Sequence, residues 1–377
     1  MSLDSEVARL HTKDIYKQLA DHLFSLGMGY PPSEDLEEIL RANLNPKEAE
    51  VALALPTRII PLQPTGIDNI VEAVNLSRAE LEDILEDLSQ KGLLFSGKTK
   101  EGKKGYALQQ VGFGFPQAFF WKGEDTPHAR NMAILVAKYF NRKVTQEAYG
   151  HAETKPFRYI PLGETIEFDI HGVYPYHVME HVIHQAKVIA VAHCPCRMTA
   201  YLRGRGCEHP TEVCMKFDDL AGYVVERDLA REITKEEALK IIKQSEEAGL
   251  VHLVDNAIGD TKHCCNCCGC ACWSVGSIKR RKIPRDVIMA TYFIRETDED
   301  ACTGCGECVE ACPVDAVTME GDFPTVDEEW CIGCGVCVAK CLTTAAQLEL
   351  RPDKVGHMPA PDFKKLHEKI LEEKGLK

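Results

Sequence analysis

Apolar and polar positions in the first third of the chain follow the period of amphipathic helices. This period predicts helices over residues 46–55, 66–74 and 77–92, with one or two further helices before them. The third helix opens with a capping box, a serine followed three residues later by glutamate. Two short apolar segments, 93–95 and 106–108, flank a turn rich in glycine and lysine and predict a β-hairpin. We therefore expect a unit of helices that ends in a hairpin.

Three helices followed by a hairpin resemble a winged helix-turn-helix domain, in which the helix over residues 77–92 would enter the DNA major groove. That helix carries more acidic than basic side chains. The acids are Glu80, Glu82, Asp83, Glu86 and Asp87, and the bases are Arg78 and Lys91. Because carboxylates repel DNA phosphates, this helix argues against DNA binding and for a structural or partner-docking role.

In the middle of the chain, a helix, a short buried strand and a group of cysteines occur twice in succession. Residues 175–185 predict the first helix, with Pro175 in its first turn, and residues 188–192 the first strand. Residues 234–249 predict the second helix, which again opens with a capping box, and residues 250–254 the second strand. This order predicts an α/β unit and suggests an internal duplication.

The chain is acidic, with 44 basic and 58 acidic residues among 377 and a formal net charge of -14. Such a charge argues against general nucleic-acid binding. The N-terminal residues show no signal-peptide pattern, and no apolar run approaches the roughly 20 residues that span a bilayer. We expect a cytoplasmic protein of an anaerobic or microaerobic cell, in which the 18 cysteines bind metal rather than form disulfides.

Eight cysteines form two copies of one spacing, C-x2-C-x2-C-x3-C, which begins at Cys302 and again at Cys331. The spacing indicates 4Fe-4S clusters, because three thiolates on one tight loop bind three irons of a cubane and the fourth ligand comes from elsewhere. Residues 298–350 resemble a bacterial two-cluster ferredoxin domain, although Leu342 stands where that family usually has proline.

The ferredoxin resemblance also implies the ligands, since the fourth cysteine of each run serves the other cluster in such domains. It assigns one 4Fe-4S cluster to Cys302, Cys305, Cys308 and Cys341. It assigns the second 4Fe-4S cluster to Cys331, Cys334, Cys337 and Cys312.

Ten further cysteines lie in two groups in the central region. The first group is Cys194, Cys196, Cys207 and Cys214, enough for one tetrahedral zinc or one cubane. The second is the run 264–272, whose best candidate ligands are Cys265, Cys267, Cys268, Cys270 and Cys272. Adjacent cysteines cannot all face one cubane, so some must bridge, bind a second centre or stay free. The groups therefore predict one or two further iron-sulfur clusters, one larger non-cubane cluster, or a zinc site.

Three motifs together resemble the 4Fe-4S dicluster-domain proteins of anaerobes, over residues 155–350. They are Cys-Pro-Cys-Arg at 194–197, the dense cysteine segment at 265–272 and the ferredoxin-type runs. This resemblance implies electron transfer. The triplet Cys267-Cys268-Gly269 also resembles heterodisulfide-reductase cysteine motifs, a family that needs two such motifs where only one is plain here.

Six histidines and one basic segment lie close to the cysteines. His177, His181 and His184 are spaced to share one helix face, where they would relay protons, bind a metal or stay exposed to solvent. His193, His209 and His263 lie within two residues of a cysteine and would donate to cluster sulfur. The basic residues between 279 and 285 would dock an acidic partner, bind an anion or balance cluster charge.

Together these patterns predict an α+β protein. In chain order its parts are a helical, winged-helix-like domain (1–112), a connecting region (113–174), a central cysteine-rich domain (175–290), a two-cluster ferredoxin domain (291–350) and a helical tail (351–377).

The predicted function is iron-sulfur electron transfer between the C-terminal clusters and a central cysteine-rich centre. The redox partner would be a ferredoxin, a flavoprotein or an oxidoreductase subunit. Two alternatives remain open, a reductase with catalysis at the central centre and a redox-sensing winged-helix regulator. No Walker A loop and no strand followed by Gly-x-Gly-x-x-Gly supports a built-in nucleotide site.

Overall fold

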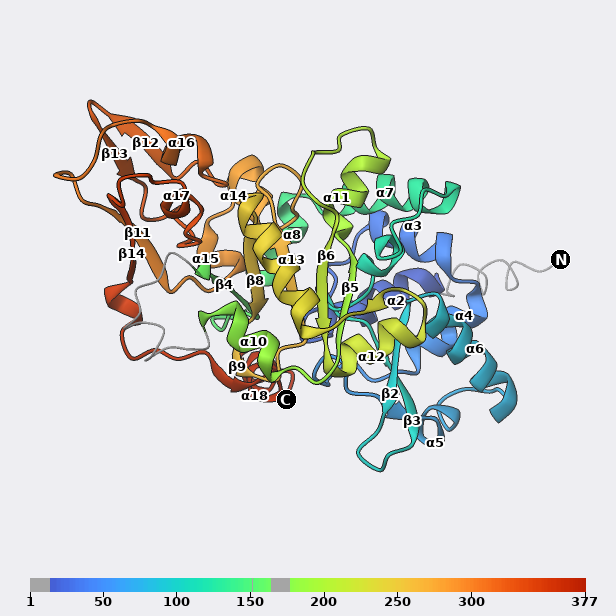
Figure 1. The fold of residues 1–377 in the computed structure, drawn as a ribbon. Helices are drawn as coiled ribbons and strands as arrows, with labels where there is room; N and C mark the ends of the chain where they lie inside the picture. Colours follow the sequence, from blue (N-terminus) through green and yellow to red (C-terminus); the bar gives the residue numbers. More distant parts are fainter. Residues whose placement is uncertain (1–13, 151, 164–176) are drawn as a thin grey trace.

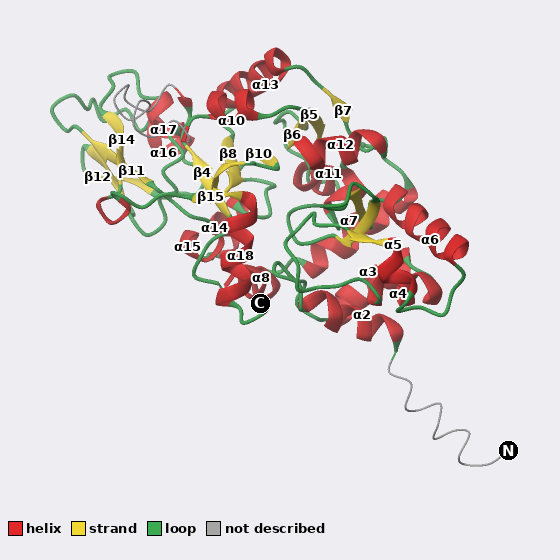
Figure 2. Cartoon of the chain, turned by 90° about the horizontal axis from the view of Figure 1, so that it is seen from below, coloured by secondary structure: helices red, strands yellow, loops and turns green. Residues whose placement is uncertain are grey.

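The computed structural model describes residues 14–150, 152–163 and 177–377. A helical N-terminal part, a central sheet and a C-terminal part rich in tight turns follow one another across the molecule (Figure 1). The chain then returns from the C-terminal part, so that its last helix lies near the middle of the molecule (Figure 2). None of the helices in the described residues is long and apolar enough to cross a lipid bilayer.

The N-terminal part contains the helices and the hairpin that the sequence predicts. Its helices are α2 (Ile15–Phe24), α3 (Glu34–Asn43), α4 (Pro46–Leu53), α5 (Ile67–Val71) and α6 (Arg78–Gln90). Its strands are β1 (Thr65–Gly66), β2 (Leu94–Lys98) and β3 (Lys104–Leu108), which form a sheet in the order β1-β3-β2. The Ser77 side chain accepts a hydrogen bond from the Glu80 amide and so caps α6, as the capping box predicts.

The region predicted to be a connection is folded and contributes to the centre of the molecule. It contains a 3-10 turn η1 (Gln117–Phe120), the helices α7 (Pro127–Tyr139) and α8 (Arg142–Gly150), and the strand β4 (Phe157–Ile160). Strand β4 pairs with a strand of the central sheet and forms its edge. The predicted helix start at Pro175 lies outside the described residues, and the helix is seen as α10 (Met179–Gln185).

The central sheet has six strands in the order β4-β8-β10-β6-β5-β7, with antiparallel neighbours throughout. The strands not yet named are β5 (Ile189–His193), β6 (Glu212–Phe217), β7 (Arg231–Glu232), β8 (Val251–Asp255) and β10 (His263–Cys267). Helices α10 and α13 (Lys235–Glu247) cover one face with their apolar side chains. The opposite face joins the core that extends into the N-terminal part.

The repeated order predicted for the centre is visible in the sheet. The units α10-β5-β6 and α13-β8-β10 follow each other, and their second strands, β6 and β10, pair at the middle of the sheet. Two helices, α11 (Pro195–Leu202) and α12 (Asp218–Glu226), fill the connections after β5 and β6. The sequence alone suggests that Cys214 lies on a loop, and this is wrong, because Cys214 lies in strand β6, which pairs with β10.

The C-terminal part is built from two similar halves. Its elements are β11 (Phe293–Thr297), α16 (Glu307–Ala311), β12 (Val317–Glu320), β13 (Phe323–Val326), α17 (Val336–Ala339) and β14 (Ala346–Leu350). Strand β11 pairs with β14, and β12 pairs with β13. Gly304 and Gly306 before α16 have positive φ angles, as do Gly333 and Gly335 before α17, so both cysteine runs turn in the same way.

Short elements join the C-terminal part to the rest of the chain. Helices α14 (Val275–Arg281) and α15 (Arg285–Ile288) precede it, and the turn η4 (Pro352–Lys354), strand β15 (Ala360–Asp362) and helix α18 (Phe363–Glu373) follow it. Strand β15 pairs in parallel with β9 (Ala257–Gly259). The predicted helical tail is therefore folded back onto the central unit.

Candidate metal centres

The pleat of two paired strands brings cysteines from distant segments onto one face of the central sheet. In β10, Cys265 and Cys267 alternate with Cys264, and successive side chains of a strand point to opposite faces. In β6, Cys214 lies on the same face as Cys265 and Cys267. His263 pairs with Lys216 and Cys264 with Met215, so continuing that register places Cys265 beside Cys214.

Three further thiols complete a ring on this face. Cys194 caps the start of α11, Cys196 lies in its first turn, and Cys272 precedes α14. Neighbouring thiols interact in the order Cys194, Cys196, Cys272, Cys267, Cys265 and Cys214, and Cys214 in turn lies near Cys194. These residues are called the six-thiol ring below, and all six line one cavity.

Backbone amides also point at the ring. The Trp273 amide donates to Cys196 Sγ and the Ser274 amide donates to Cys272 Sγ, each at 3.3 Å. Amide donors of this kind stabilise a thiolate rather than a neutral thiol. The loop after β10 is therefore shaped to hold negative sulfur.

Buried cations surround the six-thiol ring. Lys216 Nζ donates to Cys214 Sγ at 3.0 Å and lies 4.9 Å from the centre of the Trp121 ring. Although burial favours the neutral amine, the thiolates of Cys214 and Cys265 raise the pKa of Lys216 above its ordinary value. His263 lies with its Nδ1 atom 3.1 Å from Asp255 Oδ1.

Neighbouring carboxylate and thiolate groups also favour the charged forms of the other two cations, His263 and Arg197. Burial opposes protonation of His263, but Asp255 and Cys265 raise its pKa to about 9. Burial also acts to lower the pKa of Arg197, and the thiolates of Cys194, Cys268 and Cys267 raise it instead. Lys216, His263 and Arg197 are each no more than 2% exposed.

This charge pattern tests whether an iron-sulfur cluster fits the ring. His263 is compensated by the Asp255 carboxylate, but Lys216 and Arg197 beside neutral thiols would each leave a desolvation penalty of several kcal/mol without enough compensation. Thiolates bound to iron supply the missing negative charge, since iron-sulfur clusters are held by cysteine thiolates and carry net negative charge. The residues present therefore fit an anionic cluster.

Aromatic side chains close the cavity on the side of the N-terminal part. Trp121, Phe140, Tyr149, Phe157 and Trp273 all line it. Phe140 and Trp273 stack with ring centroids 5.3 Å apart. These side chains thus pack between the N-terminal part and the sheet and cover the ring.

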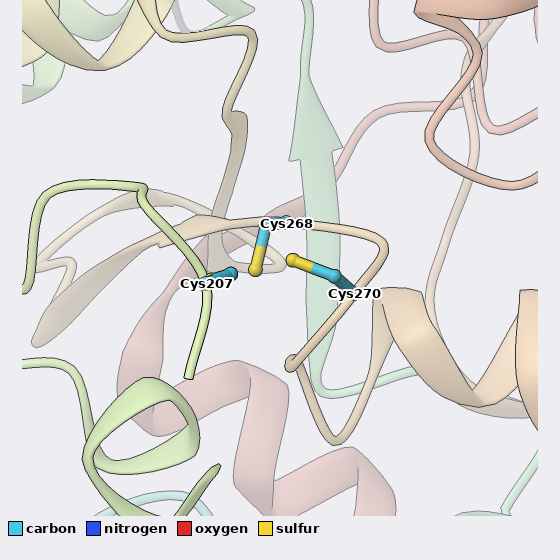
Figure 3. A group of neighbouring side chains, drawn as sticks. All are labelled: Cys207, Cys268 and Cys270. Carbon is cyan, nitrogen blue, oxygen red and sulfur yellow. The ribbon is translucent and has the colours of Figure 1, made fainter. Parts of the chain in front are cut away.

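A second group of thiols lies apart from the ring. The sulfur atoms of Cys207, Cys268 and Cys270 lie within 4.8 Å of one another, and Cys270 is exposed (Figure 3). We call this group the three-thiol site. The sequence groups Cys207 with Cys194, Cys196 and Cys214, but the structure separates them, because Cys207 lies on the long connection after α11 and reaches the turn after β10.

Cys264 belongs to neither group. It is fully buried on the helix-covered face of the sheet, and its sulfur lies 4.0 Å from that of Met179. Burial raises its pKa well above the ordinary value of a thiol. Its exclusion from the candidate ligands agrees with this position, which follows from the strand pleat.

The two C-terminal cysteine sets differ in exposure. In the first set Cys305 is exposed, Cys302 and Cys341 are half-buried and Cys308 is buried, whereas Cys312, Cys331, Cys334 and Cys337 of the second set are all buried. Burial raises the pKa of Cys331, Cys334 and Cys337, and the neighbouring Cys312 thiolate raises each of them further. Cys312 therefore lies near the cysteines of the second run. Amides of Ala316 and Ala346 donate to Cys312 Sγ and Cys341 Sγ at 3.2 and 3.4 Å.

The buried set is also the one that faces the central unit. The Leu162 amide donates to the Cys334 carbonyl at 3.1 Å, and Arg285 donates to the Cys331 carbonyl. A Cβ atom on Gly269 would lie 2.1 Å from the Pro313 carbonyl oxygen, so the loop of the dense cysteine run touches the C-terminal part directly.

Tyr159 of β4 lies between the six-thiol ring and the buried C-terminal set. Its hydroxyl is buried and has no hydrogen-bond partner among the described residues. Burial raises its pKa, and the thiolates of Cys272, Cys267 and Cys334 add to this effect. One side chain thus adjoins both groups of thiols.

The histidine stripe predicted before Cys194 does not form. His177 is buried against the rings of Tyr292 and Phe293, and burial lowers its pKa to about 3. His181 and His184 lie on exposed turns of α10, beside Gln185 and Glu180 respectively. These three side chains therefore share no site.

Several side chains of the basic segment make contacts within the protein, although Arg280 and Lys282 are also exposed to solvent. Arg280 donates to the carbonyls of Gly269, Cys270 and Cys272, and Arg285 is 3% exposed. Lys279 pairs with Asp315 at 2.7 Å and so joins α14 to the C-terminal part.

Sequence reasoning missed Lys216 and Asp255. Lys216 stands two residues after Cys214, which is the spacing that places two side chains on the same face of a strand. If residues 212–217 are recognised as a strand, this spacing identifies Lys216 as a neighbour of Cys214. Asp255 is recognisable only from the fold, since its partner His263 is brought near by the pairing of β8 with β10.

Comparison with known proteins gives one family. The model of the 4Fe-4S dicluster domain matches residues 295–342, which include both C-terminal cysteine runs. No curated protein and no solved structure matches the chain. The match leaves the six-thiol ring and the three-thiol site outside the family segment. The C-terminal part of this chain therefore carries an iron-sulfur, electron-transferring 4Fe-4S dicluster domain.

Proposed function

We propose that this chain passes electrons between the two clusters of its dicluster domain and an iron-sulfur cluster held in the six-thiol ring. The observation that supports this most is the ring itself, in which six thiols and two buried cations, Lys216 and His263, line one cavity. We assign the dicluster ligands as the sequence analysis predicts, with Cys341 and Cys312 exchanged between the runs.

The direction of the path is supported by the gradient of exposure. The cluster assigned to Cys302, Cys305, Cys308 and Cys341 has an exposed ligand, so an external redox protein can approach it. The cluster assigned to the buried set lies against the central unit through Leu162 and Arg285. Electrons would therefore enter at the exposed cluster, pass the buried one and reach the ring.

Metal analysis of ring variants tests the proposal. Iron and acid-labile sulfide are measured on anaerobically purified protein, together with EPR spectra of the reduced form. We expect about twelve irons per chain, of which a dicluster domain accounts for about eight. Cys196→Ala should remove the additional iron and its signal, whereas Cys264→Ala should keep both. A wild-type content of about eight irons, unchanged in Cys196→Ala, would refute the proposal.

A second candidate is catalysis at the ring, and the cavity beside it favours this. Lys216 and His263 border the cavity and could protonate a substrate as electrons arrive. In this reading the ring cluster reduces a disulfide or binds a ligand at an open iron. A disulfide or small ligand that changes the EPR signal of the ring, but not those of the dicluster domain, would favour the reductase.

A role as a winged-helix regulator has less support. Several acids of α6 are paired with other side chains of the protein, for example Glu82 with Arg78 at 2.8 Å and Glu86 with Arg227 of the central unit. The end of α6 and the start of β2 also contact the central unit, because Tyr223 of α12 donates to the Leu94 carbonyl at 2.8 Å. We propose that the winged-helix-like unit docks onto the sheet and covers the ring.

A further inference from the structure

The three-thiol site joins two segments that are far apart in the chain. Cys207 lies on the connection between α11 and β6, and Cys268 and Cys270 lie on the turn after β10 (Figure 3). Cys268 is buried, Cys207 is half-buried and Cys270 is exposed. The site therefore faces the protein interior at Cys268 and solvent at Cys270.

The spacing of the three sulfur atoms decides which metal group they can bind. A tetrahedral zinc ion with metal–sulfur bonds of about 2.3 Å separates its thiolates by about 3.8 Å. A cubane holds each thiolate on a different iron and directs the thiolates away from one another, so their sulfurs lie farther apart. Distances within 4.8 Å fit the single ion.

The site is separate from the six-thiol ring although their residues are neighbours in sequence. Cys267 faces the core shared with the N-terminal part, whereas Cys268 packs in the core under α10 and α13. Arg197 lies between the two groups, near Cys267 and Cys268. The three sulfur atoms that lie within 4.8 Å of one another include none from the ring.

Arg197 lies beside both the ring and the three-thiol site, and its Nη1 atom donates to the Asn266 carbonyl at 3.0 Å. The side chain is 2% exposed, and its Nε and Nη2 atoms have no hydrogen-bond partner among the described residues. Three thiolates around a divalent ion carry one net negative charge, which one guanidinium balances. A buried arginine without such a partner would be strongly destabilising.

The loop that carries Cys268 and Cys270 is held in shape by protein contacts alone. Arg280 donates to the Gly269 carbonyl at 2.6 Å and to the Cys272 carbonyl at 3.0 Å. A Cβ atom on Gly276 would lie 2.1 Å from Arg280 Nη1, so the lack of a side chain there leaves room for the guanidinium. The Arg280 contacts thus help to position the thiols of Cys268 and Cys270.

We propose that Cys207, Cys268 and Cys270 bind one tetrahedral zinc-type ion whose fourth ligand comes from solvent or a small thiol. Among the described residues, no fourth cysteine, histidine or carboxylate joins the group at the same distance. An open fourth position distinguishes reactive zinc sites from closed structural ones. This site does not depend on the cluster proposed for the ring, because its metal and its ligands are different.

Zinc and iron contents of matched variants test the assignment. Wild-type protein should hold about one zinc per chain, as three thiolates and one exchangeable ligand complete one tetrahedron. Cys207→Ser and Cys270→Ser should lose the zinc and keep all iron, whereas Cys196→Ala should lose iron and keep the zinc. Zinc retained in both serine variants, or iron lost from them, would overturn the proposal.

X-ray absorption at the zinc edge tests the open position in the wild-type protein, which avoids any folding defect of the variants. We expect three sulfur neighbours and one oxygen or nitrogen neighbour, with the fourth neighbour becoming sulfur when 2-mercaptoethanol is added. Four sulfur neighbours before the addition, or no change after it, would overturn the open fourth position.

Discussion

Removing the charge of Arg285 should lower the reduction potential of the buried dicluster cluster. Arg285 is 3% exposed and donates to the carbonyl of Cys331, a proposed ligand of that cluster. A positive charge stabilises the reduced cluster, which carries one more negative charge. At an effective dielectric constant of about 20 and a separation of roughly 7 Å, the interaction is about 2.4 kcal/mol. For a one-electron couple this corresponds to about 100 mV.

The assay is an EPR-monitored redox titration of Arg285→Gln, which keeps a donor near the Cys331 carbonyl. Two control variants remove one positive charge elsewhere. Lys279→Gln acts on a side chain that is 40% exposed, where solvent and salt screen the charge, so both potentials should stay nearly unchanged. Arg295→Gln acts between the clusters, because Arg295 lies 3.8 Å from Cys308 Sγ and lowers the pKa of Cys337.

We therefore expect Arg285→Gln to move one potential, Arg295→Gln to move both and Lys279→Gln to move neither. The reasoning is refuted if Arg285→Gln leaves both potentials within about 20 mV of wild type, a fifth of the calculated effect. It is equally refuted if Arg285→Gln moves the two potentials by the same amount.

Three further predictions concern stability. Arg227→Ala should lower the free energy of unfolding by about 3 kcal/mol, because this buried side chain donates to Ser96 Oγ at 2.8 Å across the contact of the N-terminal part with α12. Arg231→Ala, which removes an exposed ion pair with Glu212, should lower the free energy of unfolding by less than about 1 kcal/mol. Both variants are measured by urea titration. Equal losses in the two variants would contradict the greater contribution expected of Arg227. His367 is buried and its pKa is lowered to about 3, so the unfolded chain takes up its proton first as the pH falls below the ordinary value of 6.5. The contribution of His367 to the free energy of unfolding is therefore complete above that pH and should fall by about 1.4 kcal/mol per pH unit below about pH 6. In His367→Leu this contribution to the pH dependence should be missing when the free energy of unfolding is compared at about pH 7 and about pH 5. Cys264→Ala should cost about 1 kcal/mol through lost packing and leave zinc and iron contents unchanged, and any loss of metal would place Cys264 among the ligands.

The local parts of the fold follow from local sequence signals. The capping box at Ser77 sets the start of α6, and the apolar segments around the lysine-rich turn pair in the register Leu94 with Leu108. The dicluster runs are equally local, since four cysteines within a few residues fix the turn that carries them. Such features need no knowledge of distant segments.

The division of the central thiols could not be predicted, because strand pairing decides it. The run 264–272 shows no alternation of apolar and polar residues, so nothing marks residues 263–267 as a strand. Once they form one, the pleat sends Cys265 to one face and Cys264 to the other. The partner of Cys265 is Cys214, and no local pattern reveals that pairing.

The strand pleat also explains why the metal centres need the part of the chain that precedes the first cysteine. A strand register shifted by one residue would exchange the faces of Cys264 and Cys265, so the ring requires a strongly specified register. Burial of both faces of the sheet specifies the register, and helices α10 and α13 cover only one of these faces. Trp121, Phe140 and Tyr149, from the folded region that follows the N-terminal part, cover the other, where the ring lies. This region shares one core with the N-terminal part, so the chain before the first cysteine both fixes the register that assembles the ring and excludes the water that would weaken its buried charges.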